Sequence, residues 1–297
     1  MTVILLALGA ACCLGLGFVF QQAAAQRAPM KDFLSVRLLL DLVRMPLWLA
    51  GIGLMVVGMA LGAVALGMGD ITLVEPLLAT NLLFAMALSR RLTRQRLGRS
   101  GWAGLWLLAG GVTAFIVAGR PQGGERSPDH LWQWLIMGMV LGTALLLAAV
   151  AKRERVHVSL EAALLGVAAG LIYGLQDALT RISGEHFSDG GWSALLTSWQ
   201  PYAIVVLGVL ALVFVQSAFE SAPLRLSLPA LTAAQPLAGI ACGVGFLGDQ
   251  LQVTAGALAW EVIGIIAVVA GIVLIGSHPA MPPGSGRRQN VRELQPH

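Results

Sequence analysis

The stretches ITLVEPLL at residues 71–78 and LTAAQPLA at residues 231–238 decide how this chain is interpreted. Each stretch holds a Thr, then a carboxylate or an amide three residues later, then a Pro, and the second follows the first by 160 positions. The matched residues are Thr72, Glu75 and Pro76 in the first stretch and Thr232, Gln235 and Pro236 in the second. The match indicates an internal duplication.

Two further matches occur in the same order along the chain. Ala109 and Gly110 recur as Ala270 and Gly271, 161 positions later. Upstream, four residues return 155 positions later: Gly15, Leu16, Gln21 and Ala23 recur as Gly170, Leu171, Gln176 and Ala178. Identities arise by chance in an apolar, Gly-rich chain, but their constant order favours duplication, and internal repeats are typical of transporters.

The composition excludes an ordinary soluble domain. Hydrophobic residues make up 57% of the chain, charged residues 11%, and the mean hydropathy is +0.79, whereas a soluble domain has about 25% charged residues. A helix needs about 20 apolar residues to cross the hydrocarbon core of a bilayer. Nine such runs predict an all-α polytopic membrane protein with nine transmembrane helices, at 3–20, 47–67, 71–88, 102–118, 131–151, 160–180, 196–217, 226–248 and 259–276.

The distribution of Lys and Arg predicts the orientation in the membrane. With the N-terminus outside, every Lys and Arg except Arg120, Arg126 and Arg181 falls in a cytoplasmic segment, as the positive-inside rule requires. We therefore expect an integral protein of the plasma (cell inner) membrane with a cytoplasmic C-terminus. Most acidic residues fall on or near the outer side, so the outer mouth should attract cations.

The odd number of spans makes the predicted duplication an inverted one. Spans one to four form the first copy at 1–120, spans six to nine form the second at 158–276, and the connector at 121–157 carries span five. Two inverted four-helix repeats of this kind bind substrate where the copies meet. Residues 32–44 are too short to cross and predict an amphipathic helix along the interface, and residues 277–297 predict a disordered cytoplasmic tail.

Glu75 is the first candidate for binding substrate or a coupling ion, with Thr72 one turn before it. A carboxylate inside a membrane costs about 2.5–3.5 kcal/mol at the centre and usually faces the protein interior or a wet cavity. Pro76 would leave a helical carbonyl without its N–H partner, and such carbonyls coordinate cations. The alternative is that Glu75 is an acid in the first turn of a helix, favoured by the helix dipole, with Pro76 at an early position.

Asp177 is the second candidate. It shares a helical face with Gly166, Gly170 and Gly174, and small residues at this spacing bring a neighbouring helix close, so Asp177 should face protein. Tyr173 and Gln176 border that face and could supply hydroxyl and amide contacts. The alternative is a structural ion pair with Arg181, four residues later.

Comparing the two copies adds candidates and shows where their charge differs. Gln22 corresponds to Asp177, and Gln235 corresponds to Glu75, so each pair has an acid on the outer side and an amide on the inner side. Thr232 lies one turn before Gln235, and Asn81 could line the cavity further in. Capture of cations from outside is one explanation of the asymmetry, and drift after duplication is the other.

Other chemistry is absent from the sequence. Cys12, Cys13 and Cys242 give neither a disulfide framework nor a zinc spacing, and no nucleophile elbow, HExxH or Walker motif occurs. We expect no enzyme activity, no cofactor and no dedicated metal site, apart from Glu75 and Asp177 if the cargo is a cation. The Arg-rich stretch at 90–99 should contact anionic lipid and not nucleic acid.

The pattern resembles the drug/metabolite transporter superfamily (EamA-like). The resemblance rests on a Pro early in one helix of each copy, the basic loop SRRLTRQRLGRSGW at 89–102 and the closing helix LLAGGVTAFIVAG at 107–119, and it covers about residues 2–276. The usual member has ten spans in two inverted five-helix repeats, whereas here the second helix of each repeat is missing and a lone connector is present. Nine spans with an outside N-terminus resemble the NIPA-type magnesium transporter branch.

These patterns leave three functional hypotheses open. The first is a proton-coupled secondary transporter that moves a small organic metabolite or drug. The second is a transporter of Mg²⁺ or another divalent ion, which one or two carboxylates suffice to hold. The third is a non-transporting membrane scaffold or accessory subunit. The expected partners are the lipid bilayer, a small-molecule or cation substrate and, as a candidate, a second copy of the chain.

Overall fold

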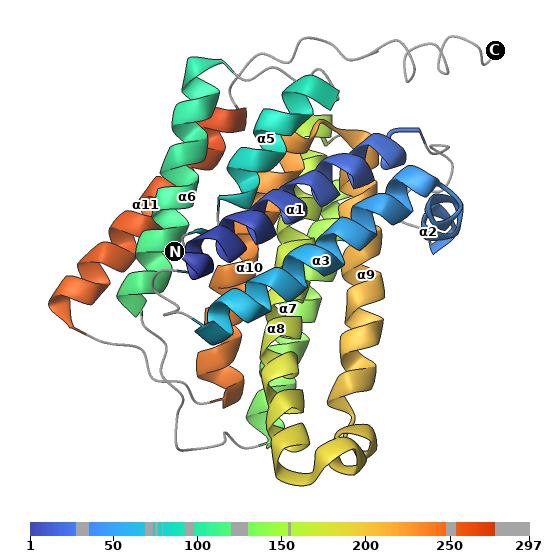
Figure 1. The fold of residues 1–297 in the computed structure, drawn as a ribbon, viewed down its shortest axis with the longest axis vertical. Coiled ribbons are helices and arrows are strands. Elements are labelled where there is room, and N and C mark those ends of the chain that lie inside the picture. Colours follow the sequence, from blue (N-terminus) through green and yellow to red (C-terminus); the bar gives the residue numbers. More distant parts are fainter. Residues whose placement is uncertain are drawn as a thin grey trace.

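A computed structural model describes the protein over residues 1–27, 36–68, 74, 77–78, 80–92, 98–119, 130–153, 156–247 and 254–276. Within these ranges every regular element is a helix (Figure 1). The chain is apolar, and in a bilayer a helix satisfies its own backbone groups. The helices are α1 Thr2–Ala25, α2 Val36–Val43, α3 Pro46–Met68, α5 Asn81–Leu92, α6 Arg99–Gly119, α7 His130–Ala151, α8 Val158–Thr197, α9 Gln200–Ser221, α10 Leu224–Cys242, the π-helix η2 Gly243–Leu247, and α11 Ala255–Gly276.

Seven of these helices are long and apolar enough to cross a membrane, so the all-α, membrane-integral class predicted from composition is confirmed. They are α1, α3, α7, α8, α9, α10 with the first part of η2, and α11. Each coincides with one of the nine predicted spans. The other two predicted spans, 71–88 and 102–118, correspond to α5 and α6, and most of residues 69–79 lie outside the described ranges.

Helix α8 is longer than the span predicted at 160–180. It runs for 40 residues, with a break at Gly191, where the backbone adopts φ 64° and ψ −152°. The continuous part before the break, residues 158–190, is about 50 Å long at 1.5 Å per residue, longer than the hydrocarbon core of a bilayer at roughly 30 Å. Hydropathy predicts where a helix leaves lipid, and the backbone can continue as a helix in water, so α8 extends beyond the predicted span. In Figure 1 the far ends of α8 and α9 extend together below the other helices.

The amphipathic helix predicted at 32–44 is present as α2. Leu38, Leu39 and Leu42 are buried, whereas Arg37 and Arg44 are exposed. The leucines recur at helical spacing, so one face of α2 is apolar and packs beside α3 and α9. The tail predicted at 277–297 and the part of the amphipathic segment before residue 36 lie outside the described residues.

Glycines bring several pairs of helices into backbone contact, among them the three described next. Between α8 and α10, a β-carbon added at Gly170 would lie 2.7 Å from the Leu231 carbonyl oxygen. Between α6 and α11, which lie side by side in Figure 1, one added at Gly111 would lie 2.7 Å from the Gly264 carbonyl oxygen. Between α1 and α3, Gly17 and Gly51 approach each other in the same way. Small residues at such crossings stabilise helix pairs in membranes, where apolar burial alone gives little.

Gly111→Ala is therefore expected to lower the thermal stability of the purified protein in detergent. The added carbon would overlap the backbone of α11, at a cost of about 1–3 kcal/mol. Gly110→Ala is the matched control, because a β-carbon there meets nothing within 4 Å, and it should be neutral or stabilising by up to about 1 kcal/mol. Equal melting temperatures for the two variants would contradict the close α6–α11 crossing.

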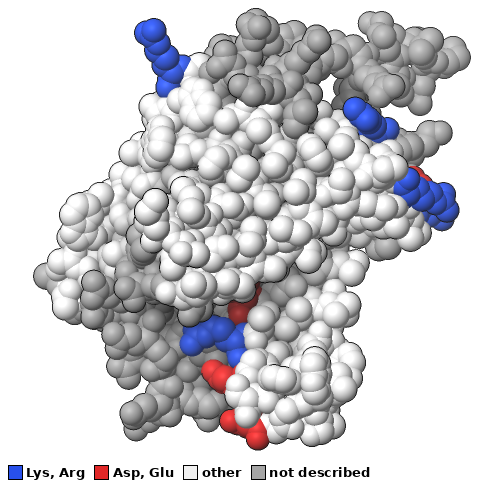
Figure 2. Space-filling model, in the orientation of Figure 1, with Lys and Arg blue, Asp and Glu red and all other residues white. Residues whose placement is uncertain are grey.

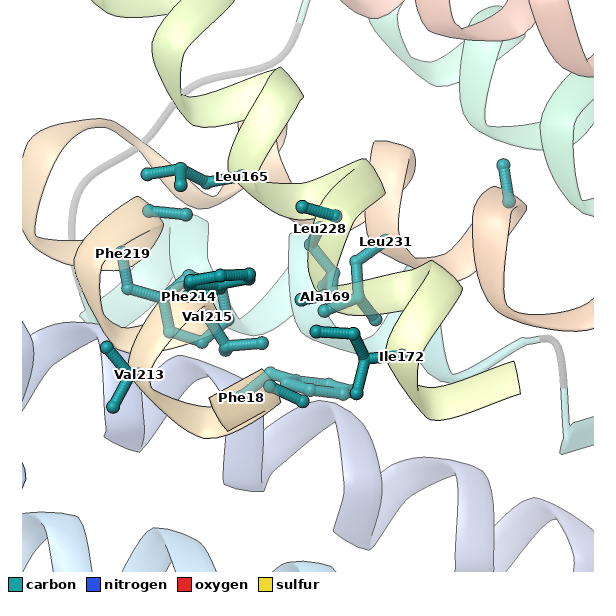
Figure 3. Packing of buried hydrophobic residues seen from close by; sticks show 14 of the residues in the cluster. Phe18, Leu165, Ala169, Ile172, Val213, Phe214, Val215, Phe219, Leu228 and Leu231 are labelled. Carbon is teal, nitrogen blue, oxygen red and sulfur yellow. The ribbon is translucent and has the colours of Figure 1, made fainter. Parts of the chain in front are cut away.

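The hydrophobic core lies where α1, α8, α9 and α10 meet. Phe18 of α1 contacts Phe219 of α9 edge to face, with ring centroids 6.3 Å apart. Ile172 of α8 and Leu231 of α10 belong to the same buried cluster. Figure 3 shows these side chains turned toward one shared interior. The core thus joins α1, from the first half of the chain, to three helices of the second half.

Candidate functional site

The structure brings together two of the predicted site residues, Asp177 and Gln235. The Gln235 side-chain nitrogen donates a hydrogen bond of 3.0 Å to the Asp177 carboxylate. Asp177 lies half-way along α8 and Gln235 lies on α10, so the bond joins two membrane-spanning helices. A hydrogen-bond partner of Asp177 is therefore the amide on α10, and Arg181, the ion-pair partner that the sequence left open, also makes an interaction of its own.

Asp177 reaches α10 because the two helices touch one turn earlier. A β-carbon added at Gly174 would lie 2.5 Å from the Gly239 backbone nitrogen and 2.6 Å from the Gln235 carbonyl oxygen. No larger residue fits this crossing, and Asp177 follows it by three residues on the same helical face. The prediction that Asp177 faces a neighbouring helix is confirmed.

The Asp177 side chain is exposed although it lies between two helices. Beyond the crossing at Gly174, the described residues thus leave Asp177 uncovered. Figure 2 shows a hollow in the lower part of the molecule, beside the far half of α8, where acidic and basic side chains gather below a largely uncharged body. Arg181, Glu185 and Asp189 on this half of α8 are all exposed.

Helix α10 is irregular next to this site. Pro229 and Pro236 lie inside the helix, and a π-helix, η2, follows directly at Gly243. Pro has no N–H, so Pro236 leaves the carbonyl of Thr232 without its helical donor, and short π-helical turns occur frequently at functional sites. Thr232 itself is half-buried on α10, one turn before Gln235. Helix α10 therefore presents an amide and a freed carbonyl within one turn.

Three further predicted residues are described. Tyr173 lies one turn before Asp177 and packs against the hydrophobic core. Gln176 turns to the other side of α8, where its side-chain nitrogen donates to the Ile204 carbonyl of α9 at 3.2 Å, while its side-chain oxygen has no hydrogen-bond partner in the described ranges. Asn81 begins α5, close to Gly15 of α1, and the described residues do not bring it to Asp177.

Gln22 occupies a different position from Asp177. It is fully buried near the end of α1, and its side-chain nitrogen donates to the Ala222 carbonyl between α9 and α10 at 3.0 Å. Thr72 and Glu75, with Pro76, lie outside the described residues, so the pairing of two acids predicted for a cation site stays a prediction. In the described residues no group of three or more His, Cys, Asp and Glu is arranged to hold a metal ion.

One polar contact between the halves was missed by sequence reasoning. The Gln216 side-chain nitrogen of α9 donates to the Gln21 side-chain oxygen of α1, and Gln21 in turn donates to the Met55 sulfur of α3. Gln21 and Gln216 are both buried, with exposures of 1% and 0%. The signal was present, because Gln21 is one of the repeated residues, but its partner lies 195 positions away.

Buried ionisable residues at the same end of α8, α9 and α10 were also missed. Glu161, Glu220 and Arg225 are each less than 10% exposed, and each makes a polar interaction. Sequence reasoning assigned Arg225 to a cytoplasmic loop, because it follows an apolar run. Its burial at the start of α10 indicates a structural role at this end of the helices.

Comparison with known proteins finds one relative along almost the whole chain. A protein of Corynebacterium glutamicum, described as uncharacterized, is 29% identical over 295 residues, which cover 96% of this chain and 98% of the relative. No family model matches the chain, and no solved structure matches it.

Proposed function

We propose that this protein is a secondary membrane transporter in which Asp177 and Gln235 form the site for substrate or coupling ion. The observation that carries the proposal is the exposed Asp177 carboxylate, near the outer end of the predicted span 160–180 and hydrogen-bonded to an amide of α10. Ionisable residues inside membrane segments are costly and mark ion or substrate pathways. A scaffold would have no use for an accessible carboxylate between two spans.

Reciprocal contacts between α6 and α11 support an inverted duplication. Gly104 of α6 approaches Gly271 of α11, and Gly111 approaches Gly264. Gly104 and Gly111 precede Gly264 and Gly271 by 160 positions, so the two contacts exchange under a two-fold axis that swaps the helices. This is the arrangement that inverted repeats produce. The proposal accordingly includes nine spans and alternating access between the two halves. The contacts also match Gly271 to Gly111, one residue from the Gly110 chosen from the sequence alone.

Contacts of α1 and α8 support the same duplication. Gln21 of α1 lies over Gly51 of α3, and its counterpart Gln176 of α8 lies over Gly208 of α9. A Gln packed on a Gly of the next long helix thus occurs in both halves, at positions that the sequence repeat pairs.

The third helix of each half pairs in a different register from the sequence match. Gly15 approaches α5 at Asn81, whereas its counterpart Gly170 approaches α10 at Leu231 and the Gln235 backbone. These contacts match Leu231 to Asn81 and Gln235 to Ala85, so they do not favour the equivalence of Gln235 with Glu75 inferred from the sequence. Asp177 and Gln235 are then a feature of the second half alone.

A proton-coupled organic cargo fits this site better than a divalent ion. One donor of Gln235 already occupies the Asp177 carboxylate, and amide N–H groups do not bind cations. Mg²⁺ requires near-octahedral oxygen ligands, and the second acid of that hypothesis, Glu75, is not among the described residues. A transported cation nevertheless remains the second candidate, because the exposed half of α8 carries Glu185 and Asp189.

The proposal is tested with purified protein in vesicles loaded with a pH-sensitive dye. Members of a metabolite and drug library are added outside under an imposed pH gradient, and a transported compound should change the internal pH only in vesicles that contain protein. A parallel set loaded with a Mg²⁺-sensitive dye tests the second candidate. Mg²⁺ entry without any library response would favour the cation transporter, and silence in both sets would favour the scaffold.

A further inference from the structure

Two residue triplets at matching positions of the repeat contact different halves of the protein. The first triplet, on α1, is Phe18, Gln21 and Gln22; the second, 155 positions later on α8, is Tyr173, Gln176 and Asp177. If the halves had identical surroundings, both triplets would make equivalent contacts. They do not.

All three residues of the first triplet cross to the other half. Phe18 packs edge to face on Phe219, Gln21 accepts a hydrogen bond from Gln216, and Gln22 donates to the Ala222 carbonyl. The two Gln side chains and Phe219 are at most 1% exposed. This end of the molecule, which the basic residues predict to be cytoplasmic, is therefore sealed between the halves.

The polar residues of the second triplet stay within their own half. Gln176 donates to the Ile204 carbonyl of α9, and Asp177 accepts from Gln235 of α10. The position on α3 that matches Gln216 is Met59, because each follows its matched glycine, Gly208 or Gly51, by eight residues. Gln216 is fully buried, whereas Met59 is 65% exposed. Helices α1 and α9 pack together, whereas the described residues of α3 and α8 have no comparable packing.

We infer that the two triplets mark alternating gates, of which the one at Phe18, Gln21 and Gln22 is closed and the one at Gln176 and Asp177 is open in this structure. The inference rests on the proposed inverted repeat. In the opposite state Gln176 crosses to α3 near Met59, the position that matches Gln216. Gln21 then releases Gln216, and the exposed Asp177 becomes covered as the other end opens.

The gates can be tested by cross-linking without knowledge of the cargo. In protein with Cys12, Cys13 and Cys242 replaced by Ala, one pair of cysteines is placed at Gln21 and Gln216 and another at Met59 and Gln176. A single reporter, Thr180→Cys, lies one turn beyond Asp177 and is exposed. Each pair is linked by mild oxidation. The rate at which a charged maleimide labels the reporter cysteine is then measured, with the reduced protein as reference.

Both pairs are expected to link, each in its own state. The Gln21–Gln216 link should leave Thr180→Cys reactive, and the Met59–Gln176 link should slow its labelling by about tenfold, as a shift to a closed population requires. Gly184→Cys, exposed one turn further out, is the matched reporter and should label at one rate throughout. Failure of either pair to link, or an unchanged Thr180→Cys rate in both linked proteins, would overturn the gates.

These results separate the gates from the transport proposal. If the labelling rate of Thr180→Cys changes as expected in protein that moves no library compound and no Mg²⁺, the gate proposal stands and the proposed cargo classes are wrong. If vesicles whose protein is fully linked between Gln21 and Gln216 transport at the same rate as unlinked vesicles, the gate proposal is wrong and the transport proposal stands.

Discussion

Asp177→Asn is expected to abolish compound-driven pH change in dye-loaded vesicles while leaving the yield of folded protein close to that of the wild type. Asn has nearly the same shape, and its side-chain oxygen can still accept the bond from Gln235, so the contact between α8 and α10 survives. The variant removes the negative charge and the ability to bind a proton. We expect the initial rate to fall at least tenfold, the effect of about 1.4 kcal/mol.

Asp189→Asn is the matched control for this prediction. Asp189 is an exposed acid on the same helix, beyond the predicted membrane boundary, and surface charges of this kind contribute about 0–1 kcal/mol. Gln235→Leu provides a second arm, because it keeps the charge and removes the amide donor, and it should weaken transport less than Asp177→Asn does. Full coupled flux in Asp177→Asn would show that the carboxylate is a packing residue.

Gly174→Val should cause the largest loss of stability of any single change at the helix crossings. The first added carbon would lie 2.5 Å from a backbone nitrogen and 2.6 Å from both the Ala238 side chain and the Gln235 carbonyl oxygen. Backbone atoms cannot rotate away, so α8 and α10 must separate. The cost should exceed about 4 kcal/mol, which is exceptional for a single substitution, and most of the purified variant should elute as aggregate in detergent.

Gly184→Val tests whether this loss comes from the crossing or from the helix. It places the same side chain on the same helix, where an added β-carbon meets nothing within 4 Å. Its size-exclusion profile and melting temperature should stay close to the wild type, apart from the small helix penalty of a β-branched residue. If both Val variants aggregate alike, the closeness of α8 and α10 is not the cause.

The fold class followed from apolar runs because the bilayer leaves the backbone few alternatives. Each of the seven helices of membrane-spanning length lies on a predicted run, since lipid forces every such run to satisfy its own hydrogen bonds. The continuation of helix α8 beyond residue 180 could not be predicted from the apolar runs. Outside lipid that constraint is lost, and the polar residues after Arg181 can form helix or loop with similar energies.

The sequence predicted Asp177 and Gln235 as candidate site residues, but it did not predict that they contact each other. Helical spacing placed Asp177 on the same face as Gly174, and the close approach of α10 to that face bears this out. Spacing cannot show which residue of the second helix will meet it, since Gln235 lies 58 positions away. The same limit hid the contact between Gln21 and Gln216, which requires two halves to fold against each other.

The extended part of α8 offers a rigid surface to which an antibody fragment could bind. The helix continues unbroken from Asp177 to the bend at Gly191. An antibody fragment bound to the exposed face around Glu185 and Asp189 would therefore keep a fixed position and orientation relative to the Asp177 carboxylate. For a 31.1 kDa chain with 57% hydrophobic residues, such a fragment supplies the mass and the alignment mark that single-particle electron microscopy needs. An experimental map of the hollow could therefore be obtained without altering any residue that lines it.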